Sequence, residues 1–406
     1  MSARSVRSAV KQPVNSWSRR QLILGISSGL LVSQGVRAKT VSDLVVPKER
    51  KLQLNAKPYY QLIEIKGTAF ERGKRYGSSA SGAIKRNINF YSSAFEKSAN
   101  IDWPQAQKLA MKFLPVIEKY CPSYVEEMKG IAEGAGRSFE DILTLNCRSE
   151  VLFAKADACS CIIIPEGRGK NGHVFMGQTW DWMASARQNS VVLKVHQEGE
   201  PSILMICEAG MVGGKGLNSE GISICLNATS VGKGKIGVPL HLMMRKVLDS
   251  SLATEAIKAV SMLPRAGSGA FNIATRSGFE MVIEFSPDQF DVIMSQGEPL
   301  IHTNHYLSPL IAPQDKAKSF IPSTFTRYNT MEKWLKKHGG RIGEKEIFKL
   351  LSNHDNYPES ICYHEDPRIS GERYCSVYAM VMDVTAGKLW VTDGYPCEGK
   401  VSEYRL

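Results

Sequence analysis

The sequence lacks the features of a membrane-spanning, repetitive or disordered protein. The apolar run at 22–32 is well short of the roughly 20 residues that cross a bilayer, and no other stretch is long and apolar enough to do so. There is no internal repeat or low-complexity segment. Apolar residues make up 43% and charged residues 22% of 406 positions. This composition excludes a disordered, collagen-like or all-coiled-coil chain and permits one large or two ordinary domains.

A strong charge of one sign is missing from most of the chain. The formal net charge is +11, but six basic residues fall within positions 1–38, where there is no acid. In the rest of the chain, the numbers of basic and acidic residues are nearly equal for its length. A basic footprint for nucleic acid is therefore absent, and no nucleic-acid partner is expected.

Residues 1–38 resemble a bacterial twin-arginine signal peptide. Arg19 and Arg20 precede the short apolar run at 22–32, and small residues lead to Ala38. This resemblance predicts export to the periplasm or the medium, a mature chain beginning near Lys39, and no stable membrane anchor. The alternatives are an uncleaved anchor and a disordered basic arm.

The nine cysteines all follow this leader. An odd number leaves at least one thiol unpaired or paired between chains. Buried cysteines in a large domain are often small apolar residues, so their number alone assigns no role.

The residue patterns predict an α-rich part followed by a β-rich part. A strand is expected at 60–65, and helices over 69–117, over 123–133 and from Ser138 onward. Short β-type runs then follow, interrupted by helices. The expected strands lie at 161–164, 174–177, 191–195, 203–206, 222–226, 271–275, 279–285 and 290–294, with a last pair at 376–384 and 387–392; the expected helices lie at 238–249 and 251–262. This order indicates an α+β layered fold over an antiparallel sheet.

Cys159 stands where the α-rich part gives way to the β-rich part, and three interpretations are open. It is a core thiol, it forms a metal site with Cys161, His302 and His305, or it becomes an N-terminus after cleavage behind Ala158. The usual paired spacing of a metal site is absent, which weighs against the second.

Several blocks spread over about 60–400 resemble the isopenicillin-N acyltransferase (acyl-CoA:6-aminopenicillanic acid acyltransferase) family of N-terminal-nucleophile hydrolases. Each block is weak alone, but their types and order together are specific to that family. The blocks are Glu127–Gly136, Glu140–Asn146, Asp157-Ala158-Cys159, Gly177–Trp182, Glu208–Gly213, Gly216–Gly221, Ile283–Pro287 and His302–His305.

The resemblance implies a four-layer αββα sandwich and a precursor that cuts itself between Ala158 and Cys159. The products are an α-chain of residues 39–158, mainly helical, and a β-rich catalytic chain of residues 159–406. They are expected to stay associated as one structural domain, 39–406. The family commonly has glycine before the cysteine, so Ala158 is a mild departure.

The resemblance also assigns roles to three residues. Cys159 is the nucleophile: a thiol with a pKa of about 8.5 needs a base, and its own α-amine, with a pKa near 7.7–8.0, can serve. Asp181 holds and orients that amine. Asn304 donates to the oxyanion of the tetrahedral intermediate. His302 and His305 frame the loop and receive no chemical role.

One position departs from the family pattern. The family has arginine after Ser-Ile-Cys, whereas here Cys362 is followed by Tyr363. Arg368 and Arg373 are the candidates to replace the missing guanidinium.

These observations predict an exported, self-processing cysteine amidohydrolase or acyltransferase. Its partner is a small N-acyl amino compound whose linear amide is cleaved through a thioester, and no metal or organic cofactor is needed. Hydrolysis is favoured over transfer because water is abundant outside the cytoplasm and acyl-CoA is not. The alternatives are a non-catalytic exported binding protein on the same fold and a Cys/His metal-binding protein.

Overall fold

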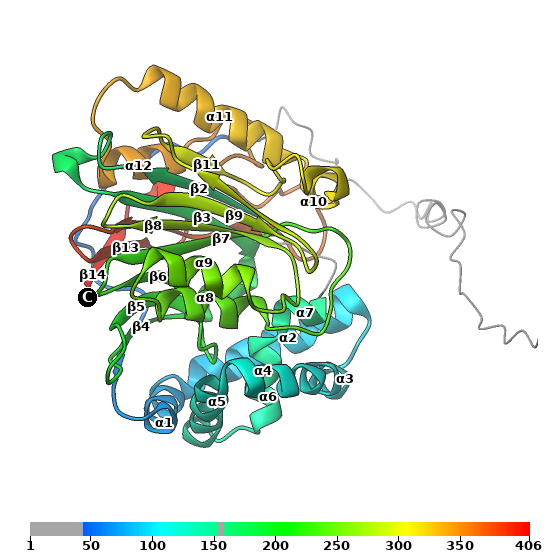
Figure 1. The fold of residues 1–406 in the computed structure, drawn as a ribbon. Coiled ribbons are helices and arrows are strands. Elements are labelled where there is room, and N and C mark those ends of the chain that lie inside the picture. Colours follow the sequence, from blue (N-terminus) through cyan, green and yellow to red (C-terminus); the bar gives the residue numbers. More distant parts are fainter. Residues whose placement is uncertain (1–43, 153–157) are drawn as a thin grey trace, which may run out of the picture. The chain divides into compact units, whose positions relative to one another are not determined.

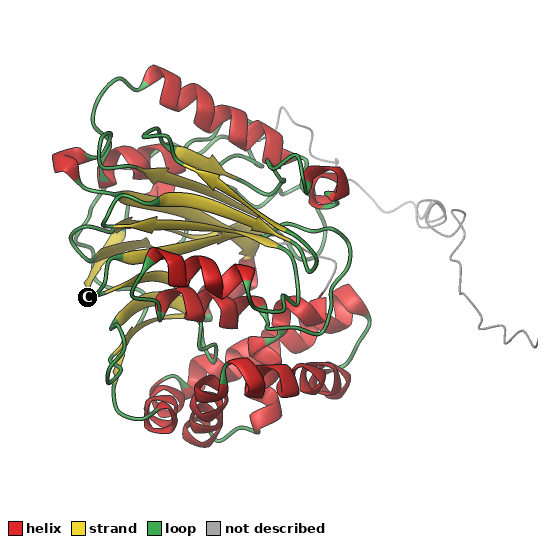
Figure 2. Cartoon of the chain, viewed as in Figure 1, coloured by secondary structure: helices red, strands yellow, loops and turns green. Residues whose placement is uncertain are grey.

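The computed structural model describes residues 44–152 and 158–406. The predicted signal peptide at 1–38 lies outside the described residues, as does Asp157. No helix in these two ranges is long and apolar enough to cross a membrane. The described chain forms two β-sheets stacked on each other, with helices on both outer faces (Figures 1 and 2).

The N-terminal part is helical, as predicted. After strand β1 (Leu62–Ile65), the chain forms α1 (Ala69–Ser79), α2 (Ser81–Ala99), α3 (Trp103–Ala110), α4 (Leu114–Tyr120), α5 (Pro122–Ala135), α6 (Phe139–Asn146) and α7 (Arg148–Leu152). Side-chain caps set several starts: Thr68 caps α1 and Ser138 caps α6. Helices α1 and α5 touch backbone to backbone, because a Cβ on Gly73 would lie 2.0 Å from the carbonyl oxygen of Glu127.

The larger sheet has eight strands in the order β1-β4-β5-β6-β7-β8-β9-β10. Its pairs are antiparallel except β1 with β4, which is parallel. The strands after β1 are β4 (Ser190–Val195), β5 (Ile203–Glu208), β6 (Lys215–Asn218), β7 (Ile222–Asn227), β8 (Gly269–Thr275), β9 (Glu280–Phe285) and β10 (Phe290–Met294). Helices α8 (Leu240–Leu248) and α9 (Ala253–Ser261) lie on the same side of this sheet as α1–α7 (Figure 1).

The smaller sheet has six antiparallel strands in the order β11-β2-β3-β12-β13-β14. They are β11 (Leu300–His302), β2 (Ala158–Ile164), β3 (Phe175–Met183), β12 (Tyr374–Asp383), β13 (Lys388–Thr392) and β14 (Val401–Arg405). Its outer face is covered by α11 (Ser323–Lys337) and α12 (Glu344–Leu351), with the short α10 (Ala317–Phe320) beside them (Figure 1).

Alternation along β2 explains the layers. Cys161 and Ile163 belong to the apolar core between the sheets, whereas Ile162 and Ile164 pack with residues of α11 and α12. Because both faces are covered, the run Ile162–Ile164 is apolar throughout. The predicted four-layer αββα sandwich is therefore confirmed.

Three strands were not expected from the sequence. β6 carries a buried lysine and a glycine, β11 has only three residues, and β14 mixes polar and apolar side chains. None of them offers a clear period-two pattern. The predicted pair 376–384 and 387–392 is present, but β14 follows it and closes the sheet.

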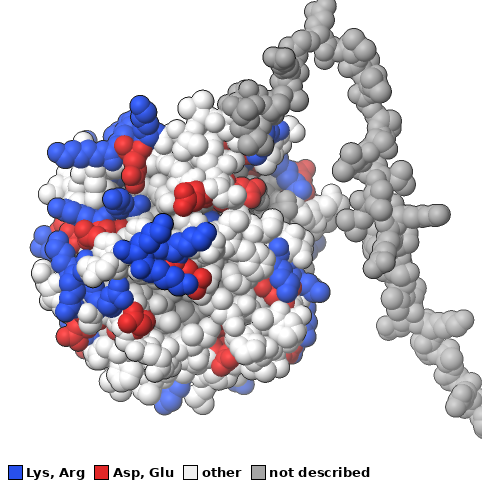
Figure 3. Space-filling view, turned by 90° about the horizontal axis from the view of Figure 1, so that it is seen from above, with Lys and Arg blue, Asp and Glu red and all other residues white. Residues whose placement is uncertain are grey.

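Residues near the start of the described chain run along residues near its end. The backbone N–H groups of Arg50, Gln53 and Ala56 donate to carbonyls at Cys397, Gly399 and Val401. The face seen in Figure 3 carries lysine and arginine interspersed with aspartate and glutamate.

Candidate active site

Cys159 lies in the interior of the smaller sheet. It is the second residue of β2, pairs with Trp180 of β3, and is 1% exposed. It belongs to the core cluster between the two sheets. The structure contains no disulfide in its described residues, and all nine cysteines are buried.

Both backbone ends of Cys159 are held by side chains from other elements. Its N–H donates to Asn304 Oδ1 at 2.9 Å, and its carbonyl oxygen accepts from Arg327 Nη1 at 2.7 Å and from Asn227 Nδ2 at 3.1 Å. Asn227 ends β7 in the opposite sheet and is itself oriented by Asn272 Nδ2 at 2.7 Å. The backbone of Cys159 is therefore held by three side chains: Asn304, Arg327 and Asn227.

Arg327 contributes a guanidinium that the sequence did not reveal. It lies on α11, is 1% exposed, and also donates to Ser160 Oγ at 2.9 Å and Asn304 Oδ1 at 2.8 Å. Burial lowers its pKa, and the carboxylate of Asp181 is the main opposing influence. Arg327 thus contacts the predicted nucleophile, the residue that follows it and Asn304.

Asn304 lies beside Cys159, in the loop after β11. Its Oδ1 accepts from two groups that can only donate, the N–H of Cys159 and the guanidinium of Arg327, and this fixes the orientation of the amide. Its Nδ2 donates to the carbonyl of Ala228 at 3.0 Å. The contact seen with Cys159 is made by the amide oxygen, and the oxyanion role of the amide N–H stays a prediction.

Asp181 lies on β3 directly opposite Ala158 and is fully buried. Oδ1 accepts from Ser376 Oγ at 2.6 Å, and Oδ2 accepts from Thr179 Oγ1 at 3.4 Å. Burial raises the pKa of this carboxyl to about 7, against the opposing influence of Arg327. An acid with such a pKa can gain or lose a proton near neutral pH.

The two arginines proposed to replace the family's arginine contact other groups. Arg368 pairs with Asp366 at 2.7 Å, and Arg373 donates to the carbonyl of Ile369 at 3.2 Å. The guanidinium at Cys159 comes instead from Arg327. The local motif after Cys362 does not supply this guanidinium, because it comes from a helix that is distant along the chain from Cys159.

The alternative metal site of Cys159 and Cys161 with His302 and His305 is not formed in the described residues. His302 bonds Glu284 through Nε2 at 2.8 Å and Thr303 through Nδ1 at 2.7 Å. His305 Nδ1 lies 2.8 Å from Thr324 Oγ1, and burial lowers the pKa of His305 to about 4. Both histidines therefore support the loop that carries Asn304.

A small cavity of about 20 Å³ lies next to Trp180, the residue paired with Cys159. Lys215 lines it, is 7% exposed, and has no hydrogen-bond partner at Nζ. The Nζ atom lies 5.1 Å and 5.5 Å from the ring centroids of Trp180 and Tyr378. A buried ammonium without a hydrogen-bonding partner is costly, which makes it a candidate anchor for an anionic group.

The model of the acyl-coenzyme A:6-aminopenicillanic acid acyl-transferase family matches residues 167–394. The 40 kDa form of the acyl-coenzyme A:6-aminopenicillanic-acid-acyltransferase of Emericella nidulans is 31% identical over 340 residues, which is 82% of this chain and 92% of the relative. The chain belongs to this family. It is accordingly an enzyme of the acyltransferase and amide hydrolase type.

Two solved structures resemble this acyltransferase-family member at 12% identity. A mutant of the conjugated bile acid hydrolase from Clostridium perfringens covers 61% of this chain and 97% of its own, with a TM-score of 0.43. Penicillin V acylase from Agrobacterium tumefaciens covers 58% of this chain and 82% of its own, with a TM-score of 0.29.

Proposed function

We propose that this family member is an exported cysteine amidohydrolase that activates itself by cutting between Ala158 and Cys159. The supporting observation is that Cys159 is buried and held on both sides, by Asn304 at its nitrogen and by Arg327 and Asn227 at its carbonyl. These contacts hold the backbone that carries the thiol, which favours a near-attack arrangement over the many conformations of an unrestrained residue.

In the proposed processing step, Cys159 Sγ attacks the carbonyl carbon of Ala158. The new carbon–sulfur bond replaces the carbon–nitrogen bond, and the thiol proton ends on the departing nitrogen. Asn304 Oδ1 already accepts from that nitrogen and keeps it in place. Water then opens the thioester, leaving a carboxylate on Ala158 and a free thiol and amine on Cys159.

In the proposed turnover, the freed α-amine acts as the base for its own thiol. Cys159 attacks a linear amide, and the protonated amine supplies the proton that the leaving amine needs. Water resolves the acyl-enzyme to release the acid. We place this reaction outside the cytoplasm because of the signal-like segment at 1–38. Acyl-CoA is scarce there, which favours hydrolysis over acyl transfer.

The substrate is further proposed to carry a carboxylate that binds Lys215, and the cavity there, which at about 20 Å³ holds about one water, would have to widen to admit it. Lys215 brings an ammonium with no hydrogen-bond partner to that cavity, and an anion there would offset the cost of its burial. An N-acyl amino acid meets this requirement and contains the linear amide that the thiol attacks.

The direct test is to determine every N-terminus of the purified protein by mass spectrometry while hydrolysis of N-acyl amino acids is followed. We expect one chain to begin near Lys39 and a second at Cys159. Cys159→Ala should remain a single inactive chain, and Cys161→Ser, its matched control two residues away on the same core face, should be cut and active. An uncut wild-type chain with full activity would overturn self-processing. An uncut chain without activity, insensitive to incubation, would favour the binding-protein alternative.

A further inference from the structure

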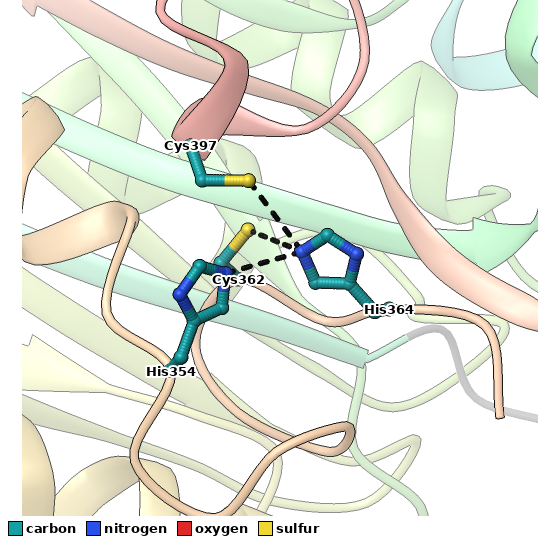
Figure 4. Close-up of side chains that lie close together, drawn as sticks. All are labelled: His354, Cys362, His364 and Cys397. Carbon is teal, nitrogen blue, oxygen red and sulfur yellow. Dashed lines mark hydrogen bonds between the residues drawn. The ribbon is translucent and has the colours of Figure 1, made fainter. Parts of the chain in front are cut away.

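Four side chains outside the candidate active site converge on one point (Figure 4). They are His354, Cys362, His364 and Cys397, and one donor atom from each lies within 4.8 Å of the others. The first three come from the segment after α12, and Cys397 comes from the short 3-10 turn Pro396–Glu398. Two segments that are distant in the sequence therefore supply two imidazoles and two thiols to a single cluster.

The separations of His364 Nε2 from the other three donor atoms match the edges of a tetrahedral zinc site. His364 Nε2 lies 3.2 Å from His354 Nε2, 3.3 Å from Cys362 Sγ and 3.5 Å from Cys397 Sγ. Zinc bonds of about 2.0–2.1 Å to nitrogen and about 2.3 Å to sulfur place tetrahedral neighbours about 3.3 Å apart for two nitrogens and about 3.5 Å apart for nitrogen and sulfur. All three separations agree with these values.

The surroundings are those of an enclosed site. Cys362, His364 and Cys397 are buried, and His354 is partly exposed. The ring of Tyr395 stacks on His364, with centroids 4.1 Å apart and an interplanar angle of 12°. The ring of Tyr357 lies 5.4 Å from the same imidazole. The aromatic rings lie against His364, and His354 is the partly exposed member of the cluster.

We propose that His354, Cys362, His364 and Cys397 bind one Zn²⁺ ion as a structural site. Two sulfur and two nitrogen ligands in a tetrahedron are typical of structural zinc, and four protein ligands leave no open position for catalysis. On binding, each thiol loses its proton to solvent and both imidazoles bind in their neutral form. The ion undergoes no redox change.

The site would hold a loop that reaches the candidate active site. Tyr363 stands between two of the ligands, and its N–H donates to Ser376 Oγ at 2.9 Å. The N–H of Ser376 returns a bond to the carbonyl of Tyr363 at 2.8 Å. Ser376 Oγ in turn donates to Asp181. Zinc would thereby fix the backbone that orients the hydroxyl partner of Asp181.

The first measurement is the zinc content of the full-length protein, purified with a reductant and dialysed. About one zinc per chain is expected. Cys397→Ser and His364→Gln should each lose it. Cys375→Ser, which removes another buried thiol outside the cluster, is the matched control and should retain it.

The second measurement protects the test against variants that fail to fold. Zinc is removed from the wild-type chain with a chelator, and Zn²⁺ alone is returned at one equivalent. The apparent melting temperature should rise by several degrees on return, and Co²⁺ in its place should give the visible absorption of tetrahedral thiolate coordination.

Two results would overturn the site. The first is a reduced, folded wild-type chain that binds no Zn²⁺ at one equivalent. The second is a native Cys362–Cys397 disulfide, seen in non-reduced peptides, in a chain that takes up no zinc after reduction. Because Cys159 contributes no ligand, either result leaves the cleavage at Ala158 to be judged separately.

Discussion

The amide nitrogen of Cys159 lies 2.9 Å from Oδ1 of Asn304, so the nitrogen that cleavage would release already has an acceptor in the uncut chain. The same oxygen accepts from Arg327. Asn304 thus has two separable functions in the proposed mechanism. Its oxygen positions the scissile bond, and its N–H is predicted to stabilise the oxyanion during turnover.

Replacing Asn304 by Asp tests this separation. Aspartate keeps an acceptor for the Cys159 N–H but removes the donor, so we expect cleavage to proceed and hydrolysis to fall by about 10²–10³-fold. Asn304→Ala should slow both. Cleavage is followed by mass spectrometry, and hydrolysis is normalised to the cut fraction. Full turnover in the cut Asp variant would contradict the oxyanion role.

Arg327 should be sensitive even to a conservative change. Lysine has one ammonium in place of a planar fork and cannot serve the Cys159 carbonyl, Ser160 and Asn304 together, so Arg327→Lys should cut itself at least about tenfold more slowly. Arg327→Met leaves these acceptors short of donors and should lower the free energy of unfolding by about 1–3 kcal/mol. Urea unfolding and a time course of cleavage measure the two effects.

The matched control is Arg368→Ala, because Arg368 pairs with Asp366, whereas Arg327 donates to the Cys159 carbonyl. It should cut at the wild-type rate. Equal slowing in Arg368→Ala and Arg327→Lys would mean that Arg327 has no special part in processing.

Asp181 predicts a pH dependence of stability. Its folded pKa is about 7 and its ordinary value is 3.8, so the folded chain keeps a proton that the unfolded chain releases between these values. The free energy of unfolding should therefore fall as pH rises from about 4 to 7, by at most roughly 4 kcal/mol from this group. Urea unfolding in the uncut Cys159→Ala background measures this slope.

Asp181→Asn should remove this contribution. Burial also raises the pKa of Glu150 to about 7, so the informative quantity is the difference between the two Cys159→Ala chains, with and without Asp181→Asn. A difference that does not change between pH 4 and 7 would show that Asp181 is ionised throughout.

Lys215 should determine the preference for anionic substrates. Lys215→Met is expected to raise KM for N-acyl amino acids by about tenfold or more and to leave KM for their methyl esters nearly unchanged, because only the free acid offers a carboxylate. Lys235→Met, at an exposed lysine, is the control. An equal rise for acids and esters would point to a packing defect instead.

Local residue patterns predict an α+β layered fold, whereas the four-layer sandwich and the role of Cys159 come from the family resemblance. Short apolar runs bounded by turn residues predict strands at 161–164 and 174–177, but β2 and β3 extend beyond them, and their pairing brings Asp181 opposite Ala158. Asn304 was reached through the family resemblance, and the structure places it at Cys159.

The rest of the site depends on packing between distant elements. Arg327 lies on a helix rich in charged residues, where an arginine usually faces water, and Asn227 ends a strand, where asparagine usually marks a turn. The sequence does not reveal the cluster of Figure 4, because Cys397 lies 33 residues beyond His364 and contacts it only in the tertiary fold.

The parallel pairing of β1 with β4 has a consequence for the cut molecule. β1 precedes the proposed cleavage point and β4 follows it, so a shared ladder of backbone hydrogen bonds would join the two products. Pulling them apart would strip an edge from the eight-stranded sheet and expose its apolar face to water. The two chains should therefore co-migrate under native conditions. When they are expressed from separate genes, they should associate only if they fold together.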